Sequence, residues 1–192
     1  MNSTSLLQQL RNQVQELHTT VDNQLAGLDD QALNFKPTPA SWSILECLEH
    51  LNRYSRYYNP AFARALKQPQ GMTPETEVAY SWLGAKSLDI VRPDNGKKSK
   101  TVKHMNPAGS RLSRAVLTEF QQHQVRLLEL LAAARGADLN RKAVPVEFFK
   151  LLKLRLGEAL EFVVLHETRH VQQALRVQQV GRQLSSAPTL AV

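Results

Sequence analysis

Residues 6–25 read LLQQLRNQVQELHTTVDNQL, and this stretch sets the pattern that recurs along the chain. Its apolar residues stand three or four positions apart: Leu6, Leu7, Leu10, Val14, Leu17, Val21 and Leu25. That spacing lines one face of an α-helix, whereas a half-buried strand would alternate every second residue. The stretch therefore predicts an amphipathic helix, and Gly27 is a suitable stop for it.

A second helix is predicted to begin at Ser43. Ser43 and Glu46 are three residues apart, the spacing at which each side chain accepts a hydrogen bond from the other's backbone N–H in a capping box. Apolar and aromatic residues then follow at helical spacing: Leu48, Leu51, Tyr54 and Tyr58. We expect Pro60 to kink or interrupt this helix, because proline lacks an N–H and its ring crowds the preceding turn.

Two further helices are predicted in the second half of the chain. The third is capped by Ser110 and ends near Gly136, and the fourth runs from about Leu156 to Val180. A short connector containing Pro145 joins them and shows no convincing hairpin signal. Five apolar residues of the fourth helix are expected to point inward: Leu160, Val163, Val164, Val171 and Ala174.

The segment 67–110 is different, because prolines and glycines break it up and only a short helix around Trp82 to Ile90 is indicated. Four long helices with one long crossover and no strand pair predict an all-α four-helix bundle. We expect one domain over residues 1–184, followed by a frayed tail over residues 185–192.

The composition is that of an ordinary globular protein, with 42% hydrophobic and 21% charged residues. No apolar run approaches the roughly 20 residues of a membrane-spanning helix, and the N-terminus lacks the pattern of a signal peptide. The single cysteine, Cys47, has no partner for an internal disulfide. These features predict a cytoplasmic protein that does not associate with a membrane.

The net charge of +7 comes mainly from basic residues within segments 92–103 and 141–155. Such clusters can contact phosphates, so a non-catalytic helical module that contacts nucleic acid through a basic face is an alternative function. No aromatic RNA-binding motif, zinc finger or Gly-rich phosphate loop accompanies the clusters. A solvated basic surface is the simpler interpretation, and nucleic acid is not the expected partner.

The sharpest chemical signal lies in the last predicted helix. His166 and His170 are four residues apart, which places both imidazoles on one face, one turn from each other. His50 lies between Leu48 and Leu51 and is expected to face inward. Three neutral imidazoles suit Zn, Ni, Cu or Fe(II) and leave an open position for catalysis. Hydrogen-bonded core histidines, or a chance pair on a helix surface, would give the same spacing.

Residues 166–170 also read as the H-E-x-x-H of zinc proteases, in which the glutamate is the general base. Here the third ligand cannot follow in the chain, because residues 171–192 contain no His, Asp, Glu or Cys. A typical zinc protease is therefore not favoured. Glu167 has two interpretations: a general base at a metal site, or a charge on the helix surface.

Three segments together resemble the DinB-like superfamily. Residues 42–51 read WSILECLEHL and are similar to that family's W-S-x-x-E-x-x-x-H-L motif. His166 and His170 match its last-helix H-x-x-x-H, and residues 98–107 resemble its crossover loop. The order and spacing of the helices agree over nearly the whole chain.

The resemblance implies an up-up-down-down bundle with a long crossover, and often a homodimer. It also implies a divalent metal ion, Zn or Ni, bound by His50, His166 and His170. The implied activity is that of a thiol S-transferase using a low-molecular-weight thiol, or of a hydrolase, on a small-molecule substrate. Glu46, one turn before His50, is our candidate for orienting that imidazole ring.

Overall fold

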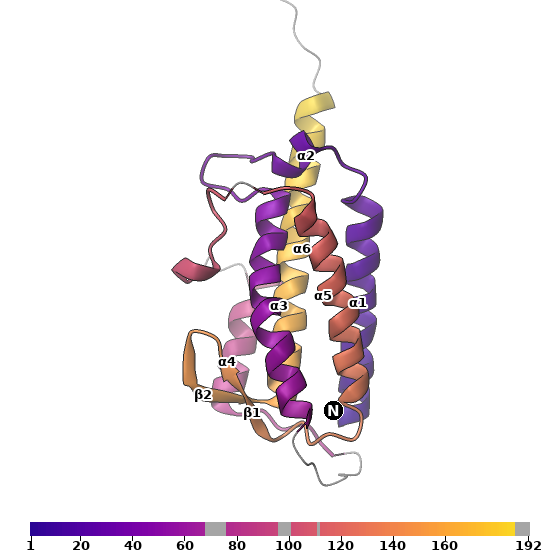
Figure 1. Ribbon diagram of the computed structural model, residues 1–192, viewed down its shortest axis with the longest axis vertical. Helices are drawn as coiled ribbons and strands as arrows, with labels where there is room; N and C mark the ends of the chain where they lie inside the picture. The colour runs from indigo at the N-terminus through magenta and orange to yellow at the C-terminus, as the bar shows by residue number, and fades with distance from the viewer. Residues whose placement is uncertain (68–75, 96–100, 111, 187–192) are drawn as a thin grey trace, which may run out of the picture.

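The computed structural model describes residues 1–67, 76–95, 101–110 and 112–186. In chain order its elements are α1 (Ser3–Gln24), α2 (Asp30–Asn34), α3 (Ile44–Lys67), α4 (Trp82–Val91), the 3₁₀ turn η1 (Lys103–Met105), α5 (Ala115–Ala133), β1 (Lys142–Val146), β2 (Phe149–Arg155) and α6 (Leu156–Ser186). The four long helices α1, α3, α5 and α6 form a bundle, which confirms the predicted fold class (Figure 1).

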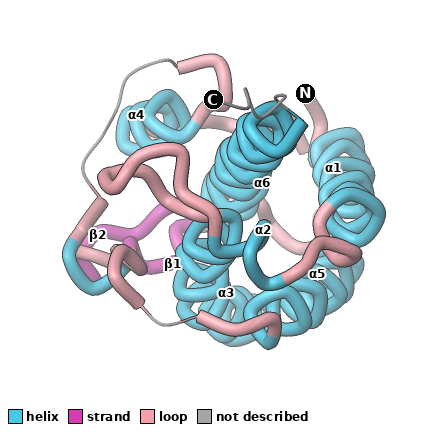
Figure 2. Tube along the Cα trace, turned by 90° about the horizontal axis from the view of Figure 1, so that it is seen from above, coloured by secondary structure: helices cyan, strands magenta, loops and turns pink. Residues whose placement is uncertain are grey.

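Each long helix packs against two others, as the view along the bundle shows (Figure 2). Both α1 and α3 pack against α5 and α6. The helix directions are up-down-down-up, not the up-up-down-down order implied by the resemblance (Figure 1). The reason is that up-up-down-down bundles need two long crossovers, and this chain has only the one between α3 and α5.

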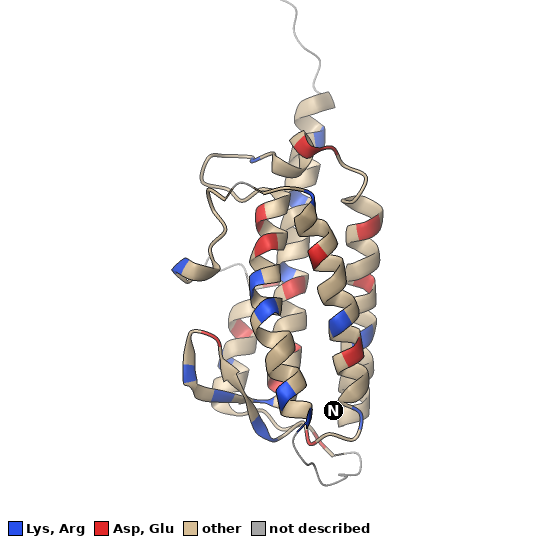
Figure 3. Cartoon of the chain, in the orientation of Figure 1, with Lys and Arg blue, Asp and Glu red and all other residues tan. Residues whose placement is uncertain are grey.

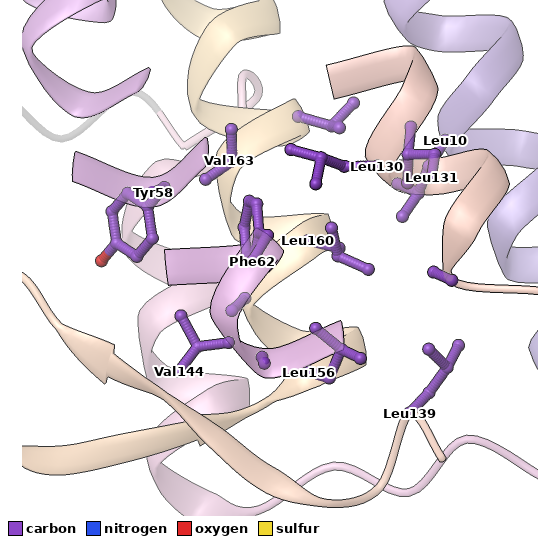
Figure 4. Close-up of a cluster of buried hydrophobic side chains, with 14 of the residues drawn as sticks. Leu10, Tyr58, Phe62, Leu130, Leu131, Leu139, Val144, Leu156, Leu160 and Val163 are labelled. Carbon is purple, nitrogen blue, oxygen red and sulfur yellow. The ribbon is translucent and has the colours of Figure 1, made fainter. Parts of the chain in front are cut away.

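The apolar faces predicted from helical spacing form the core. Leu10, Val14 and Val21 of α1 are buried, as are all five inward residues predicted for α6. One cluster surrounds Phe62 near the lower end of the bundle, where side chains of α1, α3, α5, α6 and β1 meet (Figure 4). A second cluster, around Phe120, fills the other end.

The capping box at the start of α3 is present as predicted. The Ser43 N–H donates to Glu46 Oε2 over 2.9 Å, and the Glu46 N–H donates to Ser43 Oγ over 3.1 Å. The predicted interruption at Pro60 is wrong, because α3 continues to Lys67. Pro60 lies on the exposed side, where water can bond the carbonyl that loses its partner in the preceding turn.

Two other predicted boundaries differ from the structure. Ser110 does not cap the third helix, since α5 begins five residues later at Ala115. At the other end of the chain, α6 continues to Ser186, so the first two residues of the predicted tail are helical. Residues 187–192 of that tail lie outside the described part of the chain.

The connector before α6 is an antiparallel hairpin, so the expectation of no strand pair is wrong there. Val144, Val146 and Leu154 are buried, and this burial holds the hairpin against the bundle. Pro145 and two irregularities in the register hide the alternation that would reveal a strand in the sequence. Among the described residues, no helix is both long and apolar enough to cross a bilayer.

Glu158 ties α4 to the start of α6. Its buried carboxylate accepts from the Arg155 N–H over 2.8 Å and from the Ser81 N–H just before α4. The helices approach so closely that a Cβ at Gly84 would lie 2.1 Å from the carboxyl carbon of Glu158. One side chain thus caps two helices that are far apart in sequence.

We expect Glu158→Ala to destabilise the fold by about 2–3 kcal/mol, because two N–H groups at helix starts lose their acceptor. Urea unfolding followed by circular dichroism measures the change. Glu161→Ala is the matched control on the same helix, since Glu161 accepts one hydrogen bond from an exposed Tyr80 hydroxyl. Equal effects of the two substitutions would contradict the capping role.

Candidate metal centre

Three histidines meet between α3 and α6. His50 comes from α3, and His166 and His170 come from successive turns of α6. The Nε2 atoms of His50 and His166 are 3.1 Å apart, and one ring nitrogen from each of the three residues lies within 4.8 Å of the others. This is the only such group of His, Cys, Asp and Glu side chains in the described part of the chain.

Two of the rings are held in the tautomer that a metal ligand needs. His50 Nδ1 lies 2.8 Å from the carbonyl oxygen of Met105, and His170 Nδ1 lies 3.0 Å from Gln173 Oε1. Both partners are acceptors, so each Nδ1 carries the proton and donates it. The neutral ring then keeps a lone pair on Nε2, the arrangement typical of metal-binding histidines.

Burial keeps the rings uncharged. It lowers the pKa of His50 to about 4 and the pKa of His170 to about 3, the latter with help from the nearby His50 ring. Burial also sets the pKa of His166 well below its usual value, and the other two histidines add to this effect. Neutral imidazoles bind cations, so the three residues fit a divalent ion in chemistry as well as in position.

Aromatic side chains surround the cluster. The ring centroid of Trp42 lies 4.9 Å from that of His50, and the centroids of Tyr54 and Phe162 lie 4.5 Å and 5.7 Å from that of His166. These half-buried rings reduce the access of water to the imidazoles. Sequence reasoning missed Tyr54 and Phe162, although each stands four residues from a histidine and so shares its helix face.

Glu46 does not orient His50, so that prediction is wrong. Its two oxygens accept from Lys36 Nζ, from the Ser43 N–H and from the Gly109 N–H. The His50 ring turns instead towards η1 and donates to Met105. The carboxylate is drawn to the N–H groups at the helix start and to the lysine, which leaves the carbonyl as the partner of the imidazole.

Glu167 is buried, so its interpretation as a surface charge is wrong. It is 2% exposed, and Gln124 and Ser55 lie beside it. Within the described structure, neither carboxylate oxygen has a hydrogen bond of good geometry. The residue after His166 is rotated about 100° around the helix, and Glu167 is not among the clustered ligand atoms. We do not assign it the role of a general base.

Other cysteine and histidine side chains lie outside the cluster. Cys47 is fully buried in the core, and burial raises the pKa of its thiol to about 12. His104 Nε2 lies 2.6 Å from Glu147 Oε1, and His123 Nε2 lies 3.2 Å from a carboxylate oxygen on its own helix. The two histidines have carboxylate partners of their own, and none of the three residues joins the histidine cluster.

Within the described residues, the second basic cluster lies on the hairpin, which is mainly basic (Figure 3). The first turns of α3 are acidic and its later turns are basic. Residues 96–100, which hold part of the first basic cluster and of the crossover motif, lie outside the described residues. A basic surface without a recognition motif is most simply a solvated one, and contact with nucleic acid stays an untested alternative.

Residues 9–174 match the model of the DinB superfamily. The chain belongs to this superfamily. The DinB-superfamily chain is also 28% identical to the uncharacterized protein YuaE of Bacillus subtilis (strain 168) over 162 residues, which cover 82% of this chain and 90% of YuaE.

A solved structure supports the same fold. The chain aligns with YfiT from Bacillus subtilis with a TM-score of 0.56 and 14% identity, over 93% of this chain and 87% of YfiT. YfiT is described as a probable metal-dependent hydrolase with an unusual four-helix bundle topology. At this identity the likeness establishes the fold alone.

Proposed function

We propose that this DinB-superfamily protein is a divalent-metal-dependent hydrolase of a small molecule, with Zn or Ni held by His50, His166 and His170. The observation that carries the proposal is the meeting of three neutral imidazoles, two of them with Nε2 lone pairs set by acceptors at Nδ1. Ligand atoms about 2.0–2.1 Å from one ion lie roughly 3.0–3.5 Å from each other. The 3.1 Å between His50 Nε2 and His166 Nε2 is in this range.

When bound, a divalent ion with three protein ligands lowers the pKa of a water molecule or thiol at its open position and polarises an electrophile. The chain contributes the rest. The hydrogen bond to Met105 and the contact with Gln173 hold two ligands in position, and the aromatic rings of Trp42, Tyr54 and Phe162 limit the entry of bulk water. Weak hydration around a site strengthens the electrostatic interactions within it.

Thiol S-transfer is the alternative reaction at the same centre, with a low-molecular-weight thiol as cosubstrate. We place hydrolysis first because YfiT, which shares the fold, carries that description. The homodimer expected from the resemblance stays a prediction. Cytoplasmic location likewise stays a prediction.

The test uses tag-free protein loaded with Zn²⁺ or with Ni²⁺. We expect hydrolysis of an activated ester such as p-nitrophenyl acetate to depend on the metal and to stop when a chelator removes it. A parallel assay follows the reaction of chlorodinitrobenzene with cysteine or glutathione. Metal-dependent consumption of the thiol, without ester hydrolysis, would overturn hydrolysis in favour of S-transfer.

Surface-catalysed ester hydrolysis needs a control, because exposed histidines cleave activated esters slowly. His18→Ala removes a half-buried imidazole of α1, outside the cluster, and should leave the metal-dependent rate unchanged. His170→Ala should abolish that rate. Equal rates for the two variants would contradict the assignment of activity to this centre.

A further inference from the structure

The Arg53 side chain forms hydrogen bonds with the backbone segment that orients the His50 ring. The guanidinium Nη1 donates to the carbonyl of His104 over 3.1 Å and to the carbonyl of Asn106 over 2.9 Å. These two carbonyls flank Met105, whose own carbonyl accepts from His50 Nδ1. A single side chain three residues after His50 therefore fixes both neighbours of the group that orients its imidazole.

The Arg53 side chain is itself held in place by Glu49. Arg53 Nε donates to Glu49 Oε1 over 2.9 Å, and the Glu49 side chain is 8% exposed. A planar guanidinium has several donors in a rigid arrangement, so it can bond the carboxylate and two carbonyls at once. Glu49, Arg53 and η1 thus form a chain of contacts that ends at the histidine cluster.

The η1 backbone needs this support. It lies in the crossover between α4 and α5, and the Met105 side chain is its buried anchor. The buried Met105 side chain places η1 against the core, and the contact between His104 Nε2 and Glu147 Oε1 also holds the turn, but neither contact involves the Met105 carbonyl. A change in the direction of that carbonyl would let the His50 ring exchange between its two tautomers, and the Nε2–H form has no lone pair on the nitrogen that faces His166.

We propose that Arg53 is a positioning residue of the centre, which keeps His50 in its Nδ1–H tautomer by fixing the backbone around Met105. The hydrogen bonds that Arg53 makes to described residues go to Glu49, to the two carbonyls and to Ser110, and none goes to a histidine side chain. The part of the inference that concerns metal affinity rests on the proposed function. The part that concerns the tautomer does not, because it applies to the metal-free protein.

The first measurement is ¹⁵N NMR of the His50 ring in metal-free protein. Wild type should show the shifts of a single Nδ1–H tautomer, and Arg53→Ala should show a mixture with the Nε2–H form. The second measurement is Zn²⁺ affinity by competition with a chromophoric chelator. Loss of a group that supports a metal ligand typically weakens binding by about 10–100-fold, and we expect that range for Arg53→Ala.

Arg56→Ala is the matched control. Arg56 is on the same helix and also bonds Glu49, but its other contact is with Glu119 rather than with η1. It should leave the tautomer unchanged and the Zn²⁺ affinity within about twofold of wild type. Arg53→Lys keeps the charge but has a single nitrogen in place of the Nε that bonds Glu49 and the Nη1 that bonds the two carbonyls. It cannot make all of these contacts at once, so we expect an intermediate result, which also tests the role if Arg53→Ala folds poorly.

The outcomes separate the two proposals. If Arg53→Ala and Arg53→Lys keep the wild-type tautomer and affinity, the positioning role is wrong. If wild type binds neither Zn²⁺ nor Ni²⁺, the proposed function fails, and the tautomer measurement still decides the role of Arg53. The positioning role of Arg53 is supported if Arg53→Ala shows a mixture of tautomers and Arg56→Ala shows only the Nδ1–H form.

Discussion

His50→Ala should weaken Zn²⁺ binding by roughly 10²–10³-fold and leave a folded helical protein. Four-ligand zinc sites bind with about 10–16 kcal/mol, so one ligand carries roughly 3–4 kcal/mol. His50 is the informative ligand, because it lies 116 residues before His166 and reaches the site only through the fold. Isothermal titration calorimetry on tag-free protein measures the affinity.

The fold should survive because both apolar clusters are built without His50. Far-UV circular dichroism checks this. His123→Ala is the control, since His123 is half-buried on α5 and pairs with Glu119. Binding by His50→Ala as tight as by wild type would show that the α6 histidines use a different third ligand.

Glu167→Gln should stabilise the protein, and the gain should grow with pH. Glu167 is almost completely buried, and burial raises its pKa from the usual 4.5 to about 8. Between those values the unfolded chain releases the proton while the folded chain keeps it, so wild-type stability falls as pH rises. Glutamine has no proton to lose, so the variant avoids this loss.

The difference should be small near pH 4 and on the order of 3 kcal/mol above pH 8, given about 1.4 kcal/mol per pKa unit and some relaxation around the charge. Urea unfolding of metal-free protein at several pH values measures it. Glu16→Gln, an exposed change on α1, should have no comparable effect. A destabilising Glu167→Gln at pH 9 would mean that the carboxylate is ionised and has a partner that glutamine cannot replace.

The long helices and the histidine spacing were predictable because they depend on local pattern. Apolar residues three and four apart in α1 and α6 must share a face, and so must His166 and His170. The capping box at Ser43 and Glu46 is equally local. The placement of His50 beside them came from a resemblance to a family, since no local rule relates residues 116 positions apart.

The features that were missed depend on tertiary contacts. The carbonyl of Met105 carries no side-chain signal, so no motif identifies it as the partner of His50. Glu167 stands among polar residues in the sequence, and its burial depends on Ser55 of α3 and Gln124 of α5, which lie beside it only in the folded bundle. The hairpin forms because Val144 and Leu154 find apolar surface on the bundle, which overrides the weak strand signal around Pro145.

The most direct test of the central claim is a crystal structure of tag-free protein grown with Zn²⁺ or Ni²⁺, with data collected on both sides of the metal's absorption edge. We predict one anomalous peak per chain, about 2.0–2.1 Å from the Nε2 atoms of His50, His166 and His170. An anomalous peak elsewhere and none at the three histidines would contradict the proposed site. So would histidines that bind no metal at saturating concentration, both in solution and in the crystal.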